Sequence, residues 1–361
     1  MASVTKSAGA ETLAEILSQP RCWTACWRML REQETLASVH RQFPSPAGWL
    51  FIGCGSSYYI AQAAAAVWSA VTRQRAKAVP ASDLLLFPDQ VLADASGYQP
   101  VLISRSGHTS EVLRAGEFLE SRRNQRSLAI TCAANTPLEQ IASLTIPLLP
   151  ADERSTVMTR SFTSMLMTLE ALAAVYTGRS DLCASLENLS APVEALLPDL
   201  SLRIGSFVKA RNFRDYVFLG QGPFYAIAAD AALKVTEMSC SYTQSYHTLE
   251  FRHGPKSIAD PETLVAFFVS RSGYEAESSV LTEIKALGAI TMVVTDAAYE
   301  TVRRAADFLV ELRSELGEFA WLASAVIPGQ LLGVHTGIQK GLDPDNPRNL
   351  TRVVTLSEEG A

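Results

Sequence analysis

The stretch Ser104-Arg105-Ser106-Gly107 occurs a second time in this chain of 361 residues, as Ser270-Arg271-Ser272-Gly273. The two copies are 166 residues apart. A second pair of landmarks has almost the same offset, since Gly53-Cys54-Gly55 and Gly220-Gln221-Gly222 are 167 residues apart. Near-equal offsets at two independent landmarks indicate an internal duplication.

Each of these four turns follows a short, continuously apolar stretch and precedes a helical pattern. The expected strands are 49–52, 101–103 and 127–132 in the first half and 216–219, 264–269 and 289–295 in the second. Buried strands that alternate with helices are typical of a parallel sheet covered on both faces. We therefore predict an α/β fold with two doubly wound parallel-sheet domains in tandem.

The composition shifts around this repeat predict the domain boundaries. A helical segment is expected over 11–41, before the first strand, and short helical pieces rich in Pro and Gly connect the two halves over 176–206. The end of the chain is rich in Pro and Asn. We predict a first domain over 11–180, a second over 200–340 and an extended tail over 341–361.

Composition and charge exclude several classes of protein. The chain is 48% hydrophobic and 19% charged, which fits a folded globular protein. The net charge of −6 argues against a general role in binding nucleic acid or anionic lipid, so an anionic ligand must be held locally. No secretory signal or membrane span is apparent, and the six scattered cysteines fit buried thiols in a reducing cytoplasm. No metal and no cofactor is expected.

The loop after the second strand carries hydroxyl groups where an α/β sheet binds its ligands. Ser104, Ser106, Thr109 and Ser110 surround Gly107, which lets the backbone approach a ligand closely. These side chains and the amides of the next helix fit a phosphate ester, whereas a helix cap alone needs only one hydroxyl. The second copy continues with Tyr and Glu in place of His and Thr, so we expect only the first copy to hold phosphate. The motifs of dinucleotide and nucleoside triphosphate sites are missing.

The densest cluster of titratable residues lies in the second half. Asp230, Lys234 and Glu237 have the spacing of one helix face, which also fits an ordinary solvated row of ion pairs. Shortly after this helix, His253 stands next to a Gly-Pro pair. A lysine, a carboxylate and a histidine so close in sequence favour acid–base chemistry on an alcohol.

Several of these motifs together resemble the tandem sugar isomerase (SIS) domain family, and in particular the isomerase half of glucosamine-6-phosphate synthase. The resemblance runs from about residue 13 to about residue 356. It rests on Gly53-Cys54-Gly55-Ser56-Ser57-Tyr58, Ser104-Arg105-Ser106-Gly107-His108-Thr109, Thr159-Arg160-Ser161-Phe162-Thr163, Ala232-Leu233-Lys234-Val235-Thr236-Glu237, Glu250-Phe251-Arg252-His253-Gly254-Pro255 and Pro347-Arg348-Asn349-Leu350.

The resemblance implies a role for each matching residue. Glu237 would carry a proton between C1 and C2 of a sugar, Lys234 would assist and His253 would open the sugar ring. The His-Gly-Pro loop would complete the site of a neighbouring subunit, which implies a homodimer. The residues that would surround the sugar phosphate are Ser57, Ser104, Arg105, Ser106, Thr109 and Thr156.

Two departures from the synthase pattern narrow the expected activity. The glutamine-hydrolysing domain is not found in this sequence, and Arg352 stands where the synthase has a lysine that forms a Schiff base. A guanidinium stays protonated, so Arg352 is expected to bind substrate without forming an imine.

We therefore expect an enzyme that converts an aldose phosphate to a ketose phosphate, and most concretely glucosamine 6-phosphate to fructose 6-phosphate and ammonia. A deglycase of phosphorylated sugar–amine adducts is an alternative that uses the same proton transfer. A phosphosugar-sensing regulatory module is an alternative of another class.

Overall fold

The computed structural model describes residues 7–44, 46–93 and 97–356. Within these ranges the chain forms two compact units. The first-copy unit contains 21–152, 160–188 and 351–356, and the second-copy unit contains 7–20, 153–159 and 189–350. The domain boundaries expected from the sequence stay a prediction.

The sheet of the first-copy unit is fully parallel. Its strands are β1 (Gly48–Gly53), β2 (Arg75–Pro80), β3 (Tyr98–Ile103), β4 (Leu128–Thr131) and β5 (Leu144–Pro147), in the spatial order β2-β1-β3-β4-β5. The chain reverses its direction of travel across the sheet between β1 and β3. In such sheets the carboxyl ends of the strands at this point are the usual place for a ligand.

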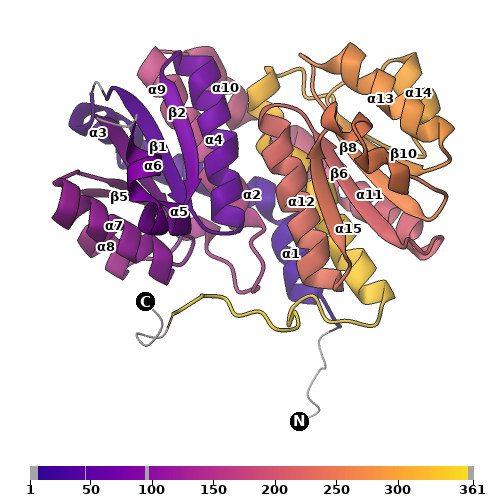
Figure 1. Ribbon diagram of the computed structural model, residues 1–361, viewed down its shortest axis with the longest axis horizontal. Coiled ribbons are helices and arrows are strands. Elements are labelled where there is room, and N and C mark those ends of the chain that lie inside the picture. The colour runs from indigo at the N-terminus through magenta and orange to yellow at the C-terminus, as the bar shows by residue number, and fades with distance from the viewer. Residues whose placement is uncertain (1–6, 45, 94–96, 357–361) are drawn as a thin grey trace, which may run out of the picture. The chain divides into compact units, whose positions relative to one another are not determined.

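Helices cover both faces of this sheet (Figure 1). The long helix α4 packs on β1 and β2 and also on α9. The described helices of this unit are α2 (Gln19–Glu32), α3 (Thr35–Gln42), α4 (Ser56–Thr72), α5 (Ala81–Leu86), α6 (Pro88–Leu92), α7 (Ser110–Arg123), α8 (Pro137–Ile141), η1 (Leu149–Ala151), α9 (Arg160–Thr177) and α10 (Ser180–Asn188).

The second-copy unit repeats this topology strand for strand. Its strands are β6 (Asp215–Gly220), β7 (Thr243–His247), β8 (Thr263–Val269), β9 (Ile290–Thr295) and β10 (Phe308–Glu311). They are all parallel, in the order β10-β9-β8-β6-β7. Read from the other edge, this is the order of the first sheet, so the predicted duplication and fold class are confirmed.

Helix α12 has the place in this unit that α4 has in the other. It packs on β6 and β7 and against α15. The contact with α15 is close: a Cβ atom on Gly329 would lie 2.4 Å from Ala231 Cβ, and one on Gly337 would lie 2.3 Å from Met238 O. The helices described here are α1 (Ala10–Leu17), α11 (Ser190–Lys209), α12 (Pro223–Ser239), η2 (Glu250–Arg252), η3 (Pro255–Ile258), α13 (Tyr274–Ala286), α14 (Glu300–Ala305), η4 (Glu318–Trp321), η5 (Ala323–Val326) and α15 (Ile327–Gln339).

Part of the C-terminal tail is tied to helix α1 in the second-copy unit. The amides of Glu11 and Thr12 donate to the Asp345 carboxylate, with N–O distances of 3.1 and 2.7 Å. The amide of Gly9 donates to Asp343 at 2.9 Å. Carboxylates at the N-terminus of a helix accept from its free amides and interact favourably with its dipole.

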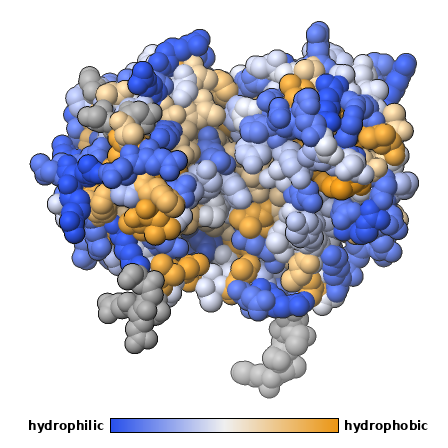
Figure 2. Space-filling model, viewed as in Figure 1, coloured by the Kyte–Doolittle hydropathy of each residue, from blue (hydrophilic) through white to orange (hydrophobic). Residues whose placement is uncertain are grey.

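Hydrophobic side chains fill the space between each sheet and its helices, whereas the face seen in Figure 2 is mainly hydrophilic with small hydrophobic patches. Of the helices within the described ranges, none is long and apolar enough to span a membrane.

Candidate active site residues in the two units

The loop expected to bind phosphate lies at the carboxyl end of β3, next to the turn that follows β1. Gly107 has φ +67°, a conformation that residues with a Cβ atom rarely adopt. A Cβ atom at this position would also lie 2.5 Å from the Thr136 side chain. The loop therefore requires glycine here to keep its shape.

The hydroxyl groups of this loop bond to one another and leave two donors open. Ser104 Oγ and Thr109 Oγ1 are 3.0 Å apart, and the Gly107 amide donates to Ser104 Oγ at 3.1 Å. Ser106 Oγ accepts from the His108 amide at 3.1 Å. Within the described part of the chain, however, neither the amide nor the hydroxyl of Ser106 donates to a protein acceptor. Both are available to an anion.

The interpretation of these hydroxyls as helix caps is wrong for Thr109. This residue is the N-cap of α7, but its side chain makes no capping hydrogen bond to the helix. Its Oγ1 instead contacts Ser104. The hydroxyl groups of Ser104 and Thr109 thus bond to each other at the carboxyl end of β3.

Arg105 and the tail lie against each other beside this loop. The Arg105 side chain is 5% exposed, and its Nη2 donates to the Arg352 carbonyl at 2.9 Å. The Leu356 amide donates to Ser110 Oγ at 3.0 Å. The Arg352 guanidinium forms an ion pair with Asp152 in the same unit. Arg352 thus contributes its charge to an ion pair at the tail.

Ser57 is in the first turn of α4, directly after the glycine turn of β1, and is 5% exposed. A Cβ atom on Gly53 would lie 2.5 Å from the Ser57 carbonyl oxygen, so strand and helix approach closely at this turn. Burial raises the pKa of Cys54 in the turn to about 11, which keeps its thiol protonated at neutral pH.

The equivalent loop of the second-copy unit is filled with carboxylates. The amide of Ser272 donates to Glu318 at 3.0 Å, and its hydroxyl donates to the same carboxylate. The Ser270 hydroxyl donates to Glu277, and Arg271 pairs with Asp296. The sequence pointed to an acidic residue in the first turn of α13, but that residue, Glu275, is exposed, and Glu277 and Glu318 take the loop donors.

Lys234 and Glu237 form an ion pair on α12. The Lys234 side chain is 1% exposed and that of Glu237 is 18% exposed, so the carboxylate is accessible beside a buried ammonium. Asp230, one turn before Lys234, is fully buried. The alternative of a solvated row of ion pairs is therefore wrong for this helix.

His253 directly follows the short helix η2 and is exposed. Its neighbours fix the segment firmly, because the Phe251 side chain is fully buried and Glu283 of α13 forms ion pairs with Arg252 and Lys256. The imidazole therefore stands on the surface of a well-anchored loop.

Thr156 belongs to the short segment 153–159 of the second-copy unit. Two buried carboxylates shape this segment. Glu15 accepts from the amides of Arg154 and Ser155, and Glu153 accepts from the Thr159 amide at 3.0 Å. These contacts fix the backbone on both sides of Thr156, whose side chain is half-buried.

The predicted site residues fall into two groups. The first-copy unit brings together the phosphate-loop residues Ser104, Arg105, Ser106 and Thr109 with Arg352, and it also contains Ser57. The second-copy unit contains Thr156, Lys234, Glu237 and His253. In the described ranges no cluster of three or more His, Cys, Asp or Glu side chains is arranged to hold a metal ion.

Sequence reasoning missed Glu318 as a loop ligand. It lies 46 residues after Ser272, and no local pattern marks it.

The chain is similar to enzymes that act on sugar phosphates. A glutamine–fructose-6-phosphate aminotransferase of Thermococcus kodakarensis is 28% identical over 359 residues, which are 95% of this chain and 58% of that protein. The chain thus spans little more than half the length of that relative. The glucosamine-6-phosphate deaminase of Thermotoga maritima is 28% identical in sequence, with 96% of this chain and 100% of that chain covered and a TM-score of 0.77.

A likeness of fold alone extends further. The tagatose-6-phosphate ketose/aldose isomerase of Escherichia coli is 23% identical, with a TM-score of 0.81 over 99% of both chains. The SIS domain family itself matches residues 49–175 and 211–326, one segment for each copy of the repeat. Since these segments make up more than half of the sequence and contain the strands of both sheets, the chain belongs to the SIS domain family.

Proposed function

We propose that this protein is a phosphosugar isomerase that converts glucosamine 6-phosphate and water to fructose 6-phosphate and ammonia. The observation that carries the proposal is the Lys234–Glu237 ion pair, a partly exposed carboxylate oriented by a buried ammonium. The open amide and hydroxyl of Ser106 supply the matching phosphate-binding group. A purely sensing module needs the second feature and has no use for the first.

The proposed reaction needs a ring opening, a proton transfer from C2 to C1 and one hydrolysis. His253 transfers the proton that opens the sugar ring. Glu237 then removes the proton from C2 of the open aldose and returns it to C1, while the C1 oxygen gains a proton and the amine nitrogen loses one, which turns the amino-aldose into a 2-imino-ketose through an enolamine. Water adds to C2, ammonia leaves, and the oxygen of the water becomes the ketone oxygen. No oxidant, reductant or cofactor is consumed.

Lys234 is assigned an orienting role. Its ammonium is buried and bonded to Glu237, so it fixes the direction of the carboxylate and favours the negative charge that develops on the sugar oxygen. Asp230 is on the same helix and fully buried. This arrangement requires no covalent bond between enzyme and sugar.

The tail supports release of ammonia without a Schiff base. Arg352 pairs with Asp152, and a guanidinium that stays protonated cannot attack a ketone. The deaminase of Thermotoga maritima, which this chain resembles over nearly all of its length, is named for the same net reaction.

The exposed position of His253 supports a homodimer. In our proposal the His253 loop of one chain completes the site of its partner, where it reaches the sugar that Glu237 of that partner deprotonates. Because Arg252, Phe251 and Lys256 anchor the loop, a partner would meet a preformed surface.

A substrate panel tests the proposed function. Purified protein is incubated with glucosamine, mannosamine and galactosamine 6-phosphates, and with glucose and tagatose 6-phosphates, while ammonia and ketose are measured separately. We expect ammonia and fructose 6-phosphate in equal amounts from glucosamine 6-phosphate, and formation at least about a hundredfold slower with the Glu237→Gln variant. Ketose formation from an amine-free aldose phosphate, without ammonia from any hexosamine, would replace the deaminase by a simple isomerase. No turnover of any member would overturn the proposal.

A further inference from the structure

The two Ser-Arg-Ser-Gly loops present the same donors to different surroundings. Ser106 keeps its amide and hydroxyl free of protein acceptors in the described ranges. The amide of Ser272, at the equivalent position, donates to Glu318 at 3.0 Å, and its hydroxyl donates to the second oxygen of the same carboxylate. One carboxylate thus occupies the donor pair that the first loop leaves open.

The second loop shares its place in the sheet and one hydrogen bond with the first, but its backbone differs, because Gly273 has φ −101° where Gly107 has φ +67°. It follows β8, which pairs with β6 as β3 pairs with β1. The amide of Gly273 donates to Ser270 Oγ at 2.9 Å, as the amide of Gly107 donates to Ser104 Oγ at 3.1 Å. The two loops therefore share the hydrogen bond from the glycine amide to the first serine, whereas α13 begins directly after Gly273 and Glu318 takes the donors of Ser272.

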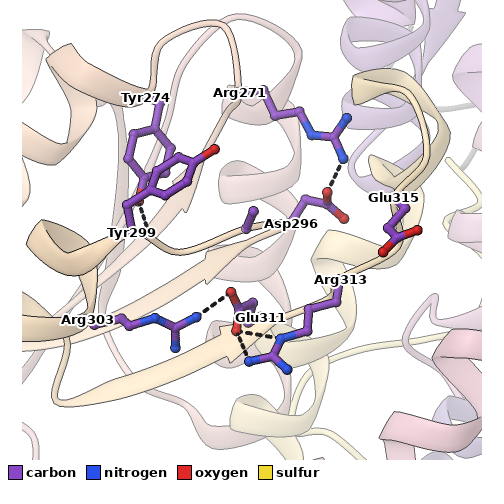
Figure 3. A pocket seen from close by; sticks show the side chains of 9 residues that line it. Arg271, Tyr274, Asp296, Tyr299, Arg303, Glu311, Arg313 and Glu315 are labelled. Atoms are coloured by element: carbon purple, nitrogen blue, oxygen red, sulfur yellow. Dashed lines mark hydrogen bonds and ion pairs between the residues drawn. The ribbon is translucent and has the colours of Figure 1, made fainter.

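A cavity opens beside the second loop at the carboxyl ends of its strands. It has a volume of about 600 Å³, and Arg271, Asp296 and Glu311 are among its lining residues. Figure 3 shows Arg271 directed toward Asp296, while Arg303 and Arg313 point toward Glu311. This volume is large enough for a small ligand such as a sugar phosphate. Arg271 links the two features, because it stands between Ser270 and Ser272 and also lines the cavity.

We propose that the second loop is a phosphate-ester site that the chain closes with its own Glu318 carboxylate. Glu318 holds the position of the anion and limits the protein to one bound phosphate ester per chain. The proposal rests on the proposed function only in the choice of a phosphate ester as ligand.

Glu318 is well placed to keep an external anion out. It begins the short helix η4, which the fully buried Trp321 anchors. The Glu318 carboxylate is tethered to the chain, so it competes with a free anion for the Ser272 donors at a high effective concentration. A free anion must also give up its translational freedom when it binds. The neighbouring arginines bring no excess positive charge, because Arg271, Arg303 and Arg313 all pair with carboxylates.

Removal of this carboxylate tests the proposal. Binding of inorganic phosphate, and then of fructose 6-phosphate, is measured by isothermal titration calorimetry on Glu318→Ala in a Ser106→Ala background, which weakens binding at the first loop. We expect phosphate binding to appear in the double variant, to be at least about tenfold weaker in Ser106→Ala alone, and to disappear again when Ser272→Ala is added. Glu315→Ala, an exposed carboxylate of the same segment, is the matched control and should open no site.

The outcomes separate this inference from the proposed function. Absence of phosphate binding in folded Glu318→Ala and Glu318→Ser proteins overturns the inference and leaves the first loop untouched. Binding that survives Ser272→Ala also overturns it, because the anion would then lie elsewhere. A wild-type protein that binds no phosphate ester at the first loop contradicts the proposed function, while a Ser272-dependent site in Glu318→Ala would still support the inference. Circular dichroism and thermal unfolding confirm that each variant is folded.

Discussion

Ser106 and Ser272 are the same residue type at equivalent positions, but they differ in the acceptors that surround them. The two donors of Ser106 are open, while those of Ser272 are taken by a carboxylate. The hydroxyl pattern was visible in the sequence, since four hydroxyl residues within seven positions exceed what a helix cap needs. The presence or absence of an acceptor was not visible, because Glu318 approaches from another part of the chain.

Ser106→Ala is expected to weaken binding of the phosphosugar and spare its chemistry. A hydrogen bond to a charged group is worth about 1.5–3 kcal/mol, so KM should rise roughly ten- to a hundredfold with kcat changed little. Steady-state kinetics with glucosamine 6-phosphate measures both constants. Ser272→Ala is the control and should leave KM as it is. An unchanged KM in Ser106→Ala would remove the phosphate from the first loop.

Glu237→Gln keeps the shape of the side chain and removes the base. We expect the variant to bind phosphosugar while exchange of the C2 proton with solvent slows by about 10²- to 10⁴-fold, the usual effect of a lost general base. Deuterium incorporation from D₂O, followed by NMR, measures this step apart from ammonia release. Exchange at the wild-type rate would show that another group moves the proton.

Among the secondary-structure elements, the strands that could be predicted from the sequence are the fully buried ones. Central strands such as β1, β3 and β8 are fully buried and read as continuous apolar runs. The edge strands were missed. All residues of β7 and most residues of β2 are half-buried. Their sequences therefore contain polar residues and resemble those of loops. The connection between the two halves also formed more helix than expected, as α11 continues through Pro198.

Helix α12 was the part of the candidate site that the sequence predicted best. A spacing of three residues is enough to place Lys234 and Glu237 on one face, and the ion pair between them confirms it. The burial of Lys234 could not be predicted in this way, since it depends on the close packing of α15. A Cβ atom on Gly333 would lie 2.9 Å from the Lys234 carbonyl oxygen.

Glu277, in the first turn of α13, makes the stability of this protein depend on pH. Burial raises its pKa from 4.5 to about 7. The folded state then holds this proton more tightly than the unfolded state, so the free energy of unfolding falls as pH rises from about 4.5 to about 7 and this contribution is constant above that range. The loss amounts to up to about 3 kcal/mol.

The Glu277→Gln variant should lack this loss. Its stability relative to the wild type is expected to increase between pH 5 and pH 8, as measured by guanidinium chloride unfolding at both values. Glu275→Gln, which changes an exposed carboxylate in the same turn, should show no such increase. A pH-independent difference between Glu277→Gln and the wild type would mean that Glu277 is already ionised at pH 5.

For the whole molecule, the proposed homodimer predicts that two inactive variants rescue each other. In the proposed dimer each site takes Glu237 from one chain and His253 from its partner. A mixed dimer of Glu237→Gln and His253→Ala chains therefore has one site with both substitutions and one site with neither. Random reassociation makes half of the dimers mixed, so about a quarter of the wild-type activity should return after the two proteins are unfolded and refolded together. Each variant refolded alone is the control. If mixed dimers form without any recovery, base and histidine come from one chain.

The tie between helix α1 and the tail also affects how the protein is made. Thr12 donates to Asp345, a residue that lies 333 positions later in the chain. At a synthesis rate of about 5–20 residues per second, the segment that contains α1 waits roughly 20–60 s for its partner to leave the ribosome. During this interval the apolar surface of that segment has no native cover. The second-copy unit can therefore finish folding only after Asp345 has been synthesised, and newly made chains are expected to depend on chaperones more than the length of either unit suggests.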